Sequence, residues 1–187
     1  TYTMGGFTTE GMNVRSFYIG NGEKVIGTTD GVYLVDEKSR KVSHVPSSAL
    51  GGAHIITNIY QYSGKYYIAS YDAGLRVLDP KTLQVSTVAS APLLATTTIS
   101  SFATSKDGML WIGCGEGIFV VDKTGKAVAH YTENNSRLCR GSVTGIYFDH
   151  NGNGWIGSEG LSLYVAATRT FENANFPDGF FNGQSNL

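Results

Sequence analysis

The sequence predicts an all-β protein made of four tandem units, each folded as a four-stranded antiparallel sheet. Three observations predict this class. The sequence repeats itself about every 43 residues, each repeat carries three turn signals, and the composition is rich in glycine and aromatic residues but poor in charge. Such a composition suits strands joined by many tight turns.

The repeat is marked by one isoleucine and one glycine in each unit. The aligned segments begin at Lys24, Lys65, Met109 and Asn153. Their isoleucines are spaced by 42, 44 and 44 residues and their glycines by 43 each; these are Ile26, Ile68, Ile112 and Ile156, and Gly31, Gly74, Gly117 and Gly160. A fixed period of this length indicates one supersecondary unit per repeat.

Three turns divide each repeat into four strands, A to D. An Asn-Gly-like pair precedes strand B, the repeat glycine lies between B and C, and an Asp-led turn follows C at Asp36, Asp79 and Asp122. In the third unit we expect strands at Ile99 to Thr104, Met109 to Gly113, Ile118 to Asp122 and Ala127 to Tyr131.

Four strands in roughly 43 residues match the blade of a β-propeller. We therefore predict a β-propeller fragment, a single partial domain over residues 1–187, with blades at about 13–50, 55–90, 98–132 and 142–175. A large residue precedes the repeat isoleucine in each unit and is expected to pack blade against blade: Val25, Tyr67, Trp111 and Trp155.

The composition also excludes several classes of partner. The formal charge is −1 and no run of Lys or Arg stands out, so nucleic acid and anionic membrane are poor partners. No apolar stretch approaches the roughly 20 residues that span a bilayer. The chain opens at Thr1 without an initiator Met, and we expect it to be part of a longer protein.

Candidate catalytic and metal-binding patterns have simpler explanations. Glu116 and Glu159 could be a catalytic carboxylate pair, but the register explains them as B–C turn residues. The segment 149–154 matches the start of a calcium loop, yet its twelfth position is Gly160 and not glutamate. The four histidines, His44, His54, His130 and His150, lack a ligand-like spacing. We expect no catalytic residue, no metal and no cofactor.

The two cysteines leave two readings open. Cys114 begins the B–C turn of the third unit, and Cys139 lies in the loop between the third and fourth units. Both should lie on one face, where they either form a disulfide or remain two free thiols.

That same face is the candidate ligand-binding surface, because B–C and D–A loops emerge together on one side of a propeller. Aromatic faces and charged forks in these loops suit a sugar or an acidic oligosaccharide. The candidate residues are His54, Tyr71, Asp72, Glu116, Arg137, Arg140 and Glu159. The alternative is that they form an ordinary solvated rim.

The repeats resemble the two-component regulator propeller family over about Val14 to Phe171. In the fourth unit the likeness rests on Ser142, Ile146, Asp149, Gly152, Asn153, Trp155, Ile156, Gly157, Gly160, Leu161, Tyr164 and Phe171. In the third unit it rests on Ile99, Gly108, Leu110, Trp111, Ile112, Gly113, Gly117 and Asp122, and it is weaker in the first two.

The resemblance implies a periplasmic, ligand-sensing fragment of a hybrid two-component histidine kinase. Members of the family respond to polysaccharide fragments, and their membrane span and kinase lie downstream. A propeller lyase or hydrolase and a protein-interaction scaffold are the alternatives. Unless they close tightly into a four-bladed ring, four blades would form an open arc with two uncovered flanks, so we expect a homo-oligomer, a dimer or a larger assembly.

Overall fold

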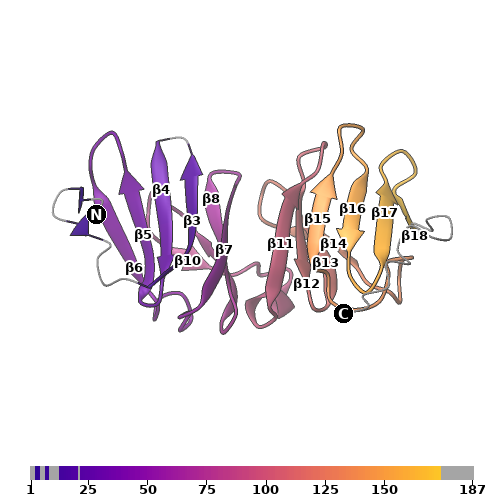
Figure 1. The fold of residues 1–187 in the computed structure, drawn as a ribbon, viewed down its shortest axis with the longest axis horizontal. Coiled ribbons are helices and arrows are strands. Elements are labelled where there is room, and N and C mark those ends of the chain that lie inside the picture. Colours follow the sequence, from indigo (N-terminus) through magenta and orange to yellow (C-terminus); the bar gives the residue numbers. More distant parts are fainter. Residues whose placement is uncertain (1–2, 5–6, 9–12, 21, 174–187) are drawn as a thin grey trace, which may run out of the picture.

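A computed structural model describes residues 3–4, 7–8, 13–20 and 22–173. In this part of the chain the predicted fold class is confirmed: four antiparallel four-stranded sheets follow one another along the sequence (Figure 1). We call them blades 1 to 4. The last two residues of the fourth predicted blade, 174 and 175, lie outside the described residues.

Each blade is a simple meander. Blade 1 comprises β3 (Val14–Gly20), β4 (Glu23–Thr28), β5 (Gly31–Asp36) and β6 (Val42–Pro46). Blade 2 comprises β7 (Ile56–Tyr62), β8 (Lys65–Ser70), β9 (Gly74–Leu78) and β10 (Val85–Ser86). Blade 3 comprises β11 (Ile99–Thr104), β12 (Leu110–Cys114), β13 (Gly117–Val121) and β14 (Ala127–Tyr131). Blade 4 comprises β15 (Gly145–Phe148), β16 (Gly154–Gly157), β17 (Leu161–Val165) and β18 (Thr170–Asn173). A separate two-stranded sheet joins β1 (Thr3–Met4) and β2 (Phe7–Thr8).

The repeat glycine begins strand C in the first three blades and directly precedes it in the fourth. Gly31, Gly74 and Gly117 have φ values of 129°, 64° and 98°, which L side chains avoid. In every blade the partner of the repeat isoleucine lies two residues after this glycine, which confirms the alignment of Gly160. The turn of blade 4 is one residue shorter than that of blade 3, on the strand B side of the glycine.

The Asp-led C–D turns are confirmed and have a common mechanism. In blade 2, Asp79 Oδ1 accepts hydrogen bonds from the main-chain N–H groups of Lys81 at 2.9 Å and Thr82 at 3.3 Å. These two donors hold the pKa of Asp79 below its ordinary value. Such Asx-type contacts replace main-chain bonds in a tight turn.

The hydrophobic core lies at the junctions between blades. The Trp111 ring of blade 3 is buried against three rings of blade 4, with centroids 4.7 Å from Tyr164, 5.2 Å from Phe148 and 6.2 Å from Phe171. Val25 and Tyr67, which hold the same repeat position in blades 1 and 2, are also buried. The expected role of this position in blade-to-blade packing is thus confirmed, while Trp155 is partly exposed at the end of the series.

One short helix was not expected. The segment between blades 2 and 3 contains a 3₁₀-helix, η1 (Pro92–Ala95), which buries Leu94 together with Val88 and Ala91. These three side chains join the core shared by blades 2 and 3 and compensate for the short outer strand β10.

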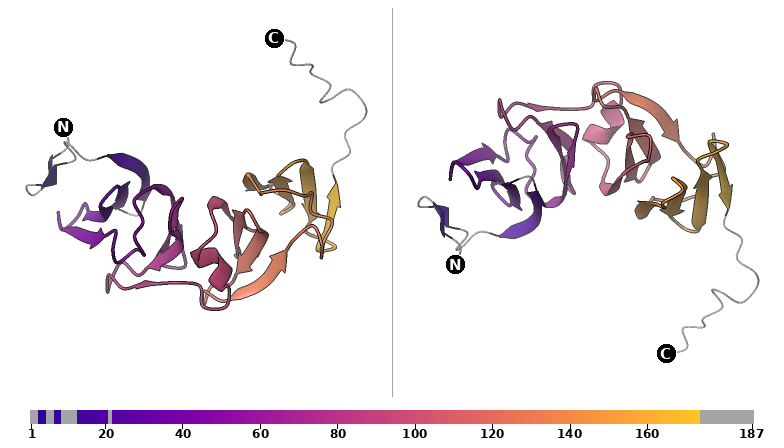
Figure 2. Two further views of the ribbon diagram at one scale, coloured as in Figure 1. Left: turned by 90° about the horizontal axis from the view of Figure 1, so that it is seen from below. Right: turned by 90° about the horizontal axis from the view of Figure 1, so that it is seen from above.

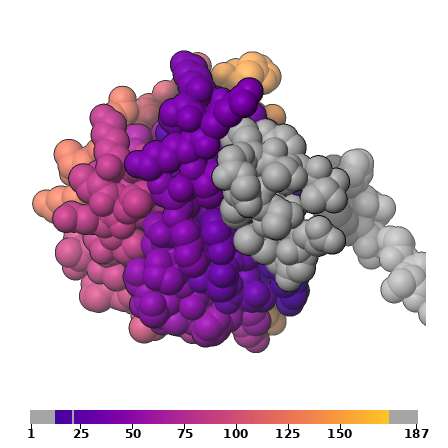
Figure 3. Space-filling view, turned by 90° about the vertical axis from the view of Figure 1, so that its left-hand side faces the viewer, coloured from indigo at the N-terminus to yellow at the C-terminus, as the bar shows by residue number. Residues whose placement is uncertain are grey.

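The blades form an open arc. Figure 2 shows the four sheets following a curve, with blades 1 and 4 at its two ends. Figure 3 views the same arc from the side of blade 1, whose indigo and purple atoms lie in front. Within the described residues, no helix has the length and apolar character needed to cross a membrane.

Candidate functional site

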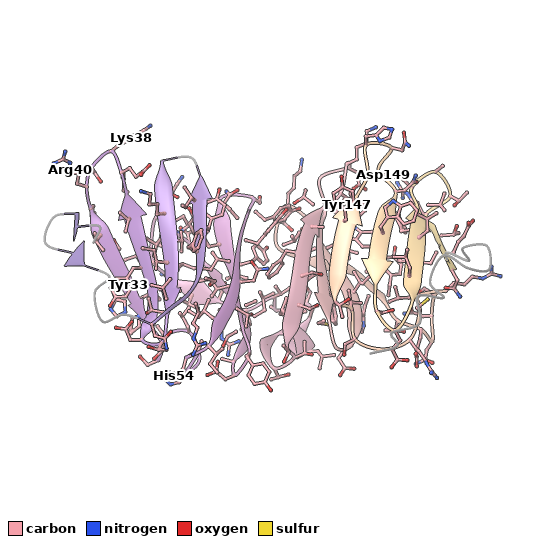
Figure 4. All side chains as sticks on the ribbon, viewed as in Figure 1. Tyr33, Lys38, Arg40, His54, Tyr147 and Asp149 are labelled. Carbon is pink, nitrogen blue, oxygen red and sulfur yellow. The ribbon has the colours of Figure 1, made fainter. Side chains whose placement is uncertain are left out.

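The B–C turns and D–A loops form one surface, which we call the loop face. Main-chain hydrogen bonds tie them together: Ser47 N–H donates to Asp30 O at 2.8 Å, and Tyr71 N–H donates to Ile55 O at 2.9 Å. Figure 4 places His54 on the lower edge of the arc, whereas Lys38, Arg40 and Asp149 lie on the opposite edge. The two kinds of loop therefore emerge together, as expected.

His54 and Asp72 form a hydrogen-bonded link between blades 1 and 2. The Asp72 carboxylate accepts hydrogen bonds from the main-chain N–H groups of His54 at 3.0 Å and Ile55 at 3.3 Å, and from the Ser70 hydroxyl. Burial raises the pKa of Asp72, but these three donors outweigh it and leave the pKa below its ordinary value. His54 Nδ1 lies 2.9 Å from the carbonyl oxygen of Thr29, so its ring also bridges to blade 1.

Tyr71 directly precedes Asp72, and its ring is largely exposed to solvent. Its main chain is fixed by the bond to Ile55, so the exposed ring projects from a rigid turn. An exposed aromatic face on a fixed backbone is suited to stacking against the apolar face of a sugar ring.

Arg140 and Glu159 form a second group at the junction of blades 3 and 4. Arg140 Nε lies 2.7 Å from Glu159 Oε2, and Glu159 N–H donates to Arg140 O at 3.2 Å. Both side chains are well exposed, so the ion pair contributes little to stability and the Arg140 guanidinium is accessible to solvent.

Glu116 does not form a carboxylate pair with Glu159, whose carboxylate is engaged by Arg140. The Glu116 main-chain oxygen lies 2.7 Å from His130 Nε2, and its residue lines a cleft of about 200 Å³ with Leu138, Cys139 and Arg140. Each of the two glutamates directly precedes the repeat glycine of its blade, so both are B–C turn residues as the register predicted.

Arg137 lies apart from the other candidates. It lines an outer groove of about 690 Å³ between the rims of blades 3 and 4, with Tyr131, Asn135, Phe171 and Glu172. Arg169 lines the same groove and was not among the sequence candidates. The sequence feature that could have identified Arg169 is its position in the C–D turn. There it has a left-handed φ of 56°, and Arg40 and Leu83, in the C–D turns of blades 1 and 2, have φ values of 57° and 59°.

The two cysteines are free thiols, so the disulfide reading is corrected. Their sulfurs contact different partners: Cys114 Sγ donates to Gly117 O and Cys139 Sγ to Asn173 Oδ1, each at 3.4 Å. Cys114 is buried, and burial raises its pKa to about 11.

Two of the four histidines share a structural role. His44 stacks on Tyr33 with ring centroids 4.3 Å apart, and His130 stacks on Phe119 at 3.8 Å.

Asp149 Oδ1 accepts hydrogen bonds from the main-chain N–H groups of Asn151 and Asn153 in its own hairpin, each at 2.9 Å. In the part of the chain that the structure describes, no group of three His, Cys, Asp or Glu could hold a metal ion.

The fold and the loop face define a partial β-propeller whose exposed loops are suited to binding. No family model and no curated protein matches the chain. Among solved structures, it is similar to the extracellular domain of the hybrid two-component system BT3049 of B. thetaiotaomicron, with 25% identity and a TM-score of 0.67 over 88% of this chain and 23% of that one.

Two further solved structures share the fold. The extracellular domain of BT4673 from the same organism has 20% identity and a TM-score of 0.63 over 88% of this chain and 22% of that one. PorZ, a surface component of the type-IX secretion system of Porphyromonas gingivalis, has 18% identity and a TM-score of 0.65 over 87% of this chain and 27% of that one.

The resemblance to extracellular domains of hybrid two-component systems is therefore confirmed. The chain spans about a quarter of the length of these structures. The likeness to the extracellular domain of a hybrid two-component system favours a sensor role.

Proposed function

We propose that the chain is part of the ligand-sensing, periplasmic region of a hybrid two-component sensor histidine kinase. The observation that carries this proposal is the likeness to the extracellular domain of BT3049, at 25% identity over 88% of the chain. The membrane span and the kinase would belong to other parts of a longer protein.

The proposed ligand is a carbohydrate, a fragment of a larger polysaccharide. Support comes from the loop face, where Tyr71 offers an exposed aromatic ring and Arg140 offers an exposed guanidinium group beside Glu159. Rings stack on sugars and guanidinium groups bind hydroxyl or carboxylate oxygens in fixed geometry.

The loops that would bind the ligand are also those that join neighbouring blades. His54 connects the blade 2 turn at Asp72 to the blade 1 turn at Thr29, and Arg140 connects a D–A loop to the turn of blade 4. A ligand that contacts these connections favours one arrangement of the blades over another, and that difference in affinity biases the attached kinase.

Calorimetric titration of the chain with neutral and acidic oligosaccharide fragments tests the proposal. We expect one class of fragment to bind, and Tyr71→Ala and Arg140→Ala each to weaken its affinity tenfold or more, which is about 1.4 kcal/mol. Arg40→Ala is the matched control, because it removes the same charge on the opposite edge of the arc (Figure 4).

Two results would argue against the proposal. Binding that both loop-face variants leave unchanged would remove the loop face as the site. Cleavage of the fragments by the chain would favour a propeller lyase or hydrolase instead.

A further inference from the structure

A pocket of about 340 Å³ lies between blades 3 and 4, on the edge of the arc opposite the loop face. The turns that join strands A and B in both blades, and the C–D turn of blade 4, contribute to it. Figure 4 places Asp149, in one of these A–B turns, on that edge. We call it the seam pocket, and its lining includes Ser105, Lys106, Trp111, Gly152, Tyr164 and Arg169. Both blades that form it are described, so the pocket belongs to an internal junction.

One strand position determines how such a junction is filled. It lies three residues after the strand A residue that pairs with the repeat isoleucine, and in blades 1 to 4 it is Gly20, Tyr62, Ser105 and Asp149. The Tyr62 side chain of blade 2 crosses to blade 3, where its hydroxyl donates to Gly108 O at 2.7 Å and to Val121 O at 3.3 Å. Ser105 has no ring to place between blades 3 and 4. The serine therefore leaves open the space that a tyrosine fills one junction earlier.

The groups that accept the Tyr62 hydroxyl have equivalents in the seam pocket. Gly108 and Gly152 each lie four residues before the repeat isoleucine, while Val121 and Tyr164 each pair with the residue two before it. Gly152 is buried, yet within the described residues no group donates a hydrogen bond to its carbonyl oxygen. Because buried main-chain carbonyls are normally paired, this oxygen is an acceptor for a hydroxyl group from outside the chain.

A donor that pairs with this carbonyl in blade 1 is diverted in blade 4. In blade 1 the equivalent oxygen, Gly22 O, accepts the main-chain N–H of Glu37 at 3.0 Å. The matching N–H of blade 4 is that of Ala166, and it donates instead to Asn153 Oδ1 at 3.1 Å. The Gly152 oxygen is therefore left for another donor.

The indole N–H of Trp111 is a second polar group of the pocket without a partner. In blade 4 the equivalent Trp155 Nε1 donates to Asp149 Oδ2 at 3.4 Å. Ser105 replaces this aspartate in blade 3, and its hydroxyl donates to the Asp107 carboxylate. Trp111 is only 3% exposed, and no residue in the described part of the chain accepts a hydrogen bond from its N–H. One pocket thus holds an unpaired acceptor and an unpaired donor.

The charged side chains of the pocket favour an anionic group. Lys106 reaches from blade 3 across the seam, since a Cβ on Gly152 would lie 3.3 Å from its Cβ and Cδ. Arg169 lines the pocket from the C–D turn of blade 4. Among the described residues neither cation has an ion-pair partner. Asp107 is the one carboxylate of the described lining and accepts the Ser105 hydroxyl, so the lining carries a net positive charge.

We propose that the seam pocket binds a small phenolic carboxylate, a hydroxylated aromatic ring that carries an acid group. The ring takes the place that Tyr62 fills one junction earlier, and its hydroxyl donates to Gly152 O. Its carboxylate faces Lys106 and Arg169, and the Trp111 indole N–H donates to the ligand. The pocket lies on the edge opposite the loop face, so this proposal does not depend on the carbohydrate proposed there.

The test is a titration of the whole chain with para-hydroxyphenylacetate, followed through the tryptophan indole N–H signals in heteronuclear NMR spectra. The chain has 2 tryptophans, so Trp111 reports on the pocket and Trp155 serves as an internal control. We expect the Trp111 signal to shift saturably and the Trp155 signal to move far less. Phenylacetate, which lacks the hydroxyl, and para-hydroxyphenylethanol, which lacks the carboxylate, should each bind about tenfold more weakly.

Two variants locate the ligand. Ser105→Tyr supplies the ring from the chain itself, as Tyr62 does in blade 2, and should abolish binding; circular dichroism checks that this variant is folded. Arg169→Gln changes an exposed turn residue, so the fold is kept, and it should weaken the affinity about tenfold. Arg40→Gln is its matched control, because Arg40 holds the same left-handed position in the C–D turn of blade 1 and should leave the affinity unchanged.

Several outcomes would overturn the proposal. One is a Trp111 signal that stays unmoved at millimolar ligand, or that shifts no more than the signal of Trp155. Another is undiminished binding by a folded Ser105→Tyr chain, or equal binding of phenylacetate. Binding of glucuronate in preference to the phenolic acid would assign the pocket to a sugar acid instead. Loss of binding in Tyr71→Ala would place the ligand on the loop face.

Discussion

Removing the Trp111 side chain should destabilise the protein far more than the same change at the equivalent Trp155. Trp111 is only 3% exposed and lies among the rings of Tyr164, Phe148 and Phe171 from the next blade. Trp→Ala at such a site loses the transfer free energy of the ring and leaves a cavity, together about 3–5 kcal/mol.

Trp155 holds the same position in its blade but has no described blade over its outer face. Its removal leaves no closed cavity, so we expect a loss of roughly 1–2 kcal/mol. The difference between the two variants, about 2 kcal/mol, measures the contribution of one blade junction.

Urea unfolding of Trp111→Ala and Trp155→Ala, measured at one low protein concentration, gives the two free energies of unfolding. Equal losses for the two tryptophans, or a larger loss for Trp155, would refute the reasoning that blade junctions carry the core.

Three further predictions concern single positions. Gly117→Ala should lower the free energy of unfolding by about 1–2 kcal/mol, because a Cβ at φ 98° would collide with a main-chain oxygen of β14; Gly115→Ala, where the nearest atoms are 3.7 Å away, should change little in the same urea titration. Asp72→Asn should reduce the loss of stability that the parent protein shows below about pH 4. The pKa of Asp72 in the folded state lies below the ordinary 3.8, so the carboxylate stabilises the fold above that value, and this stabilisation disappears as the pH falls through the folded pKa. Thermal melts in which the parent and the variant have the same pH dependence would contradict this. Cys139 should react with an alkylating reagent well before the buried Cys114, whose rise in pKa from 9.0 to about 11 alone reduces the thiolate about 100-fold; peptide mapping showing equal labelling of both would disprove it.

The blades could be predicted because each repeat carries its own turn chemistry. The limits of β11 and β14 fall where the repeat placed them, and β12 and β13 each differ by one residue. Asp79 and its equivalents specify the C–D turns through contacts within four residues, which a single sequence displays directly.

What could not be predicted depends on contacts across the chain. The helix η1 buries Leu94 between two blades, and nothing in its local sequence repeats elsewhere.

The sequence predicted which loops form the loop face, but not the contacts that individual residues make there. The loop positions of Tyr71 and Arg140 follow from the repeat, and main-chain hydrogen bonds between their loops and turns place both residues on the loop face. The pairing of Arg140 with Glu159, and the turning of Arg137 toward the outer groove, depend on how two blades meet and have no signature in a single repeat.

Nuclear Overhauser contacts of the Trp111 indole test the succession of blades most directly, since the loop face depends on it. The fold places the indole centroid 4.7 Å from the Tyr164 ring and 5.2 Å from the Phe148 ring, so strong contacts to both are expected. An indole that contacts only rings of its own blade, such as Tyr131, would contradict the account.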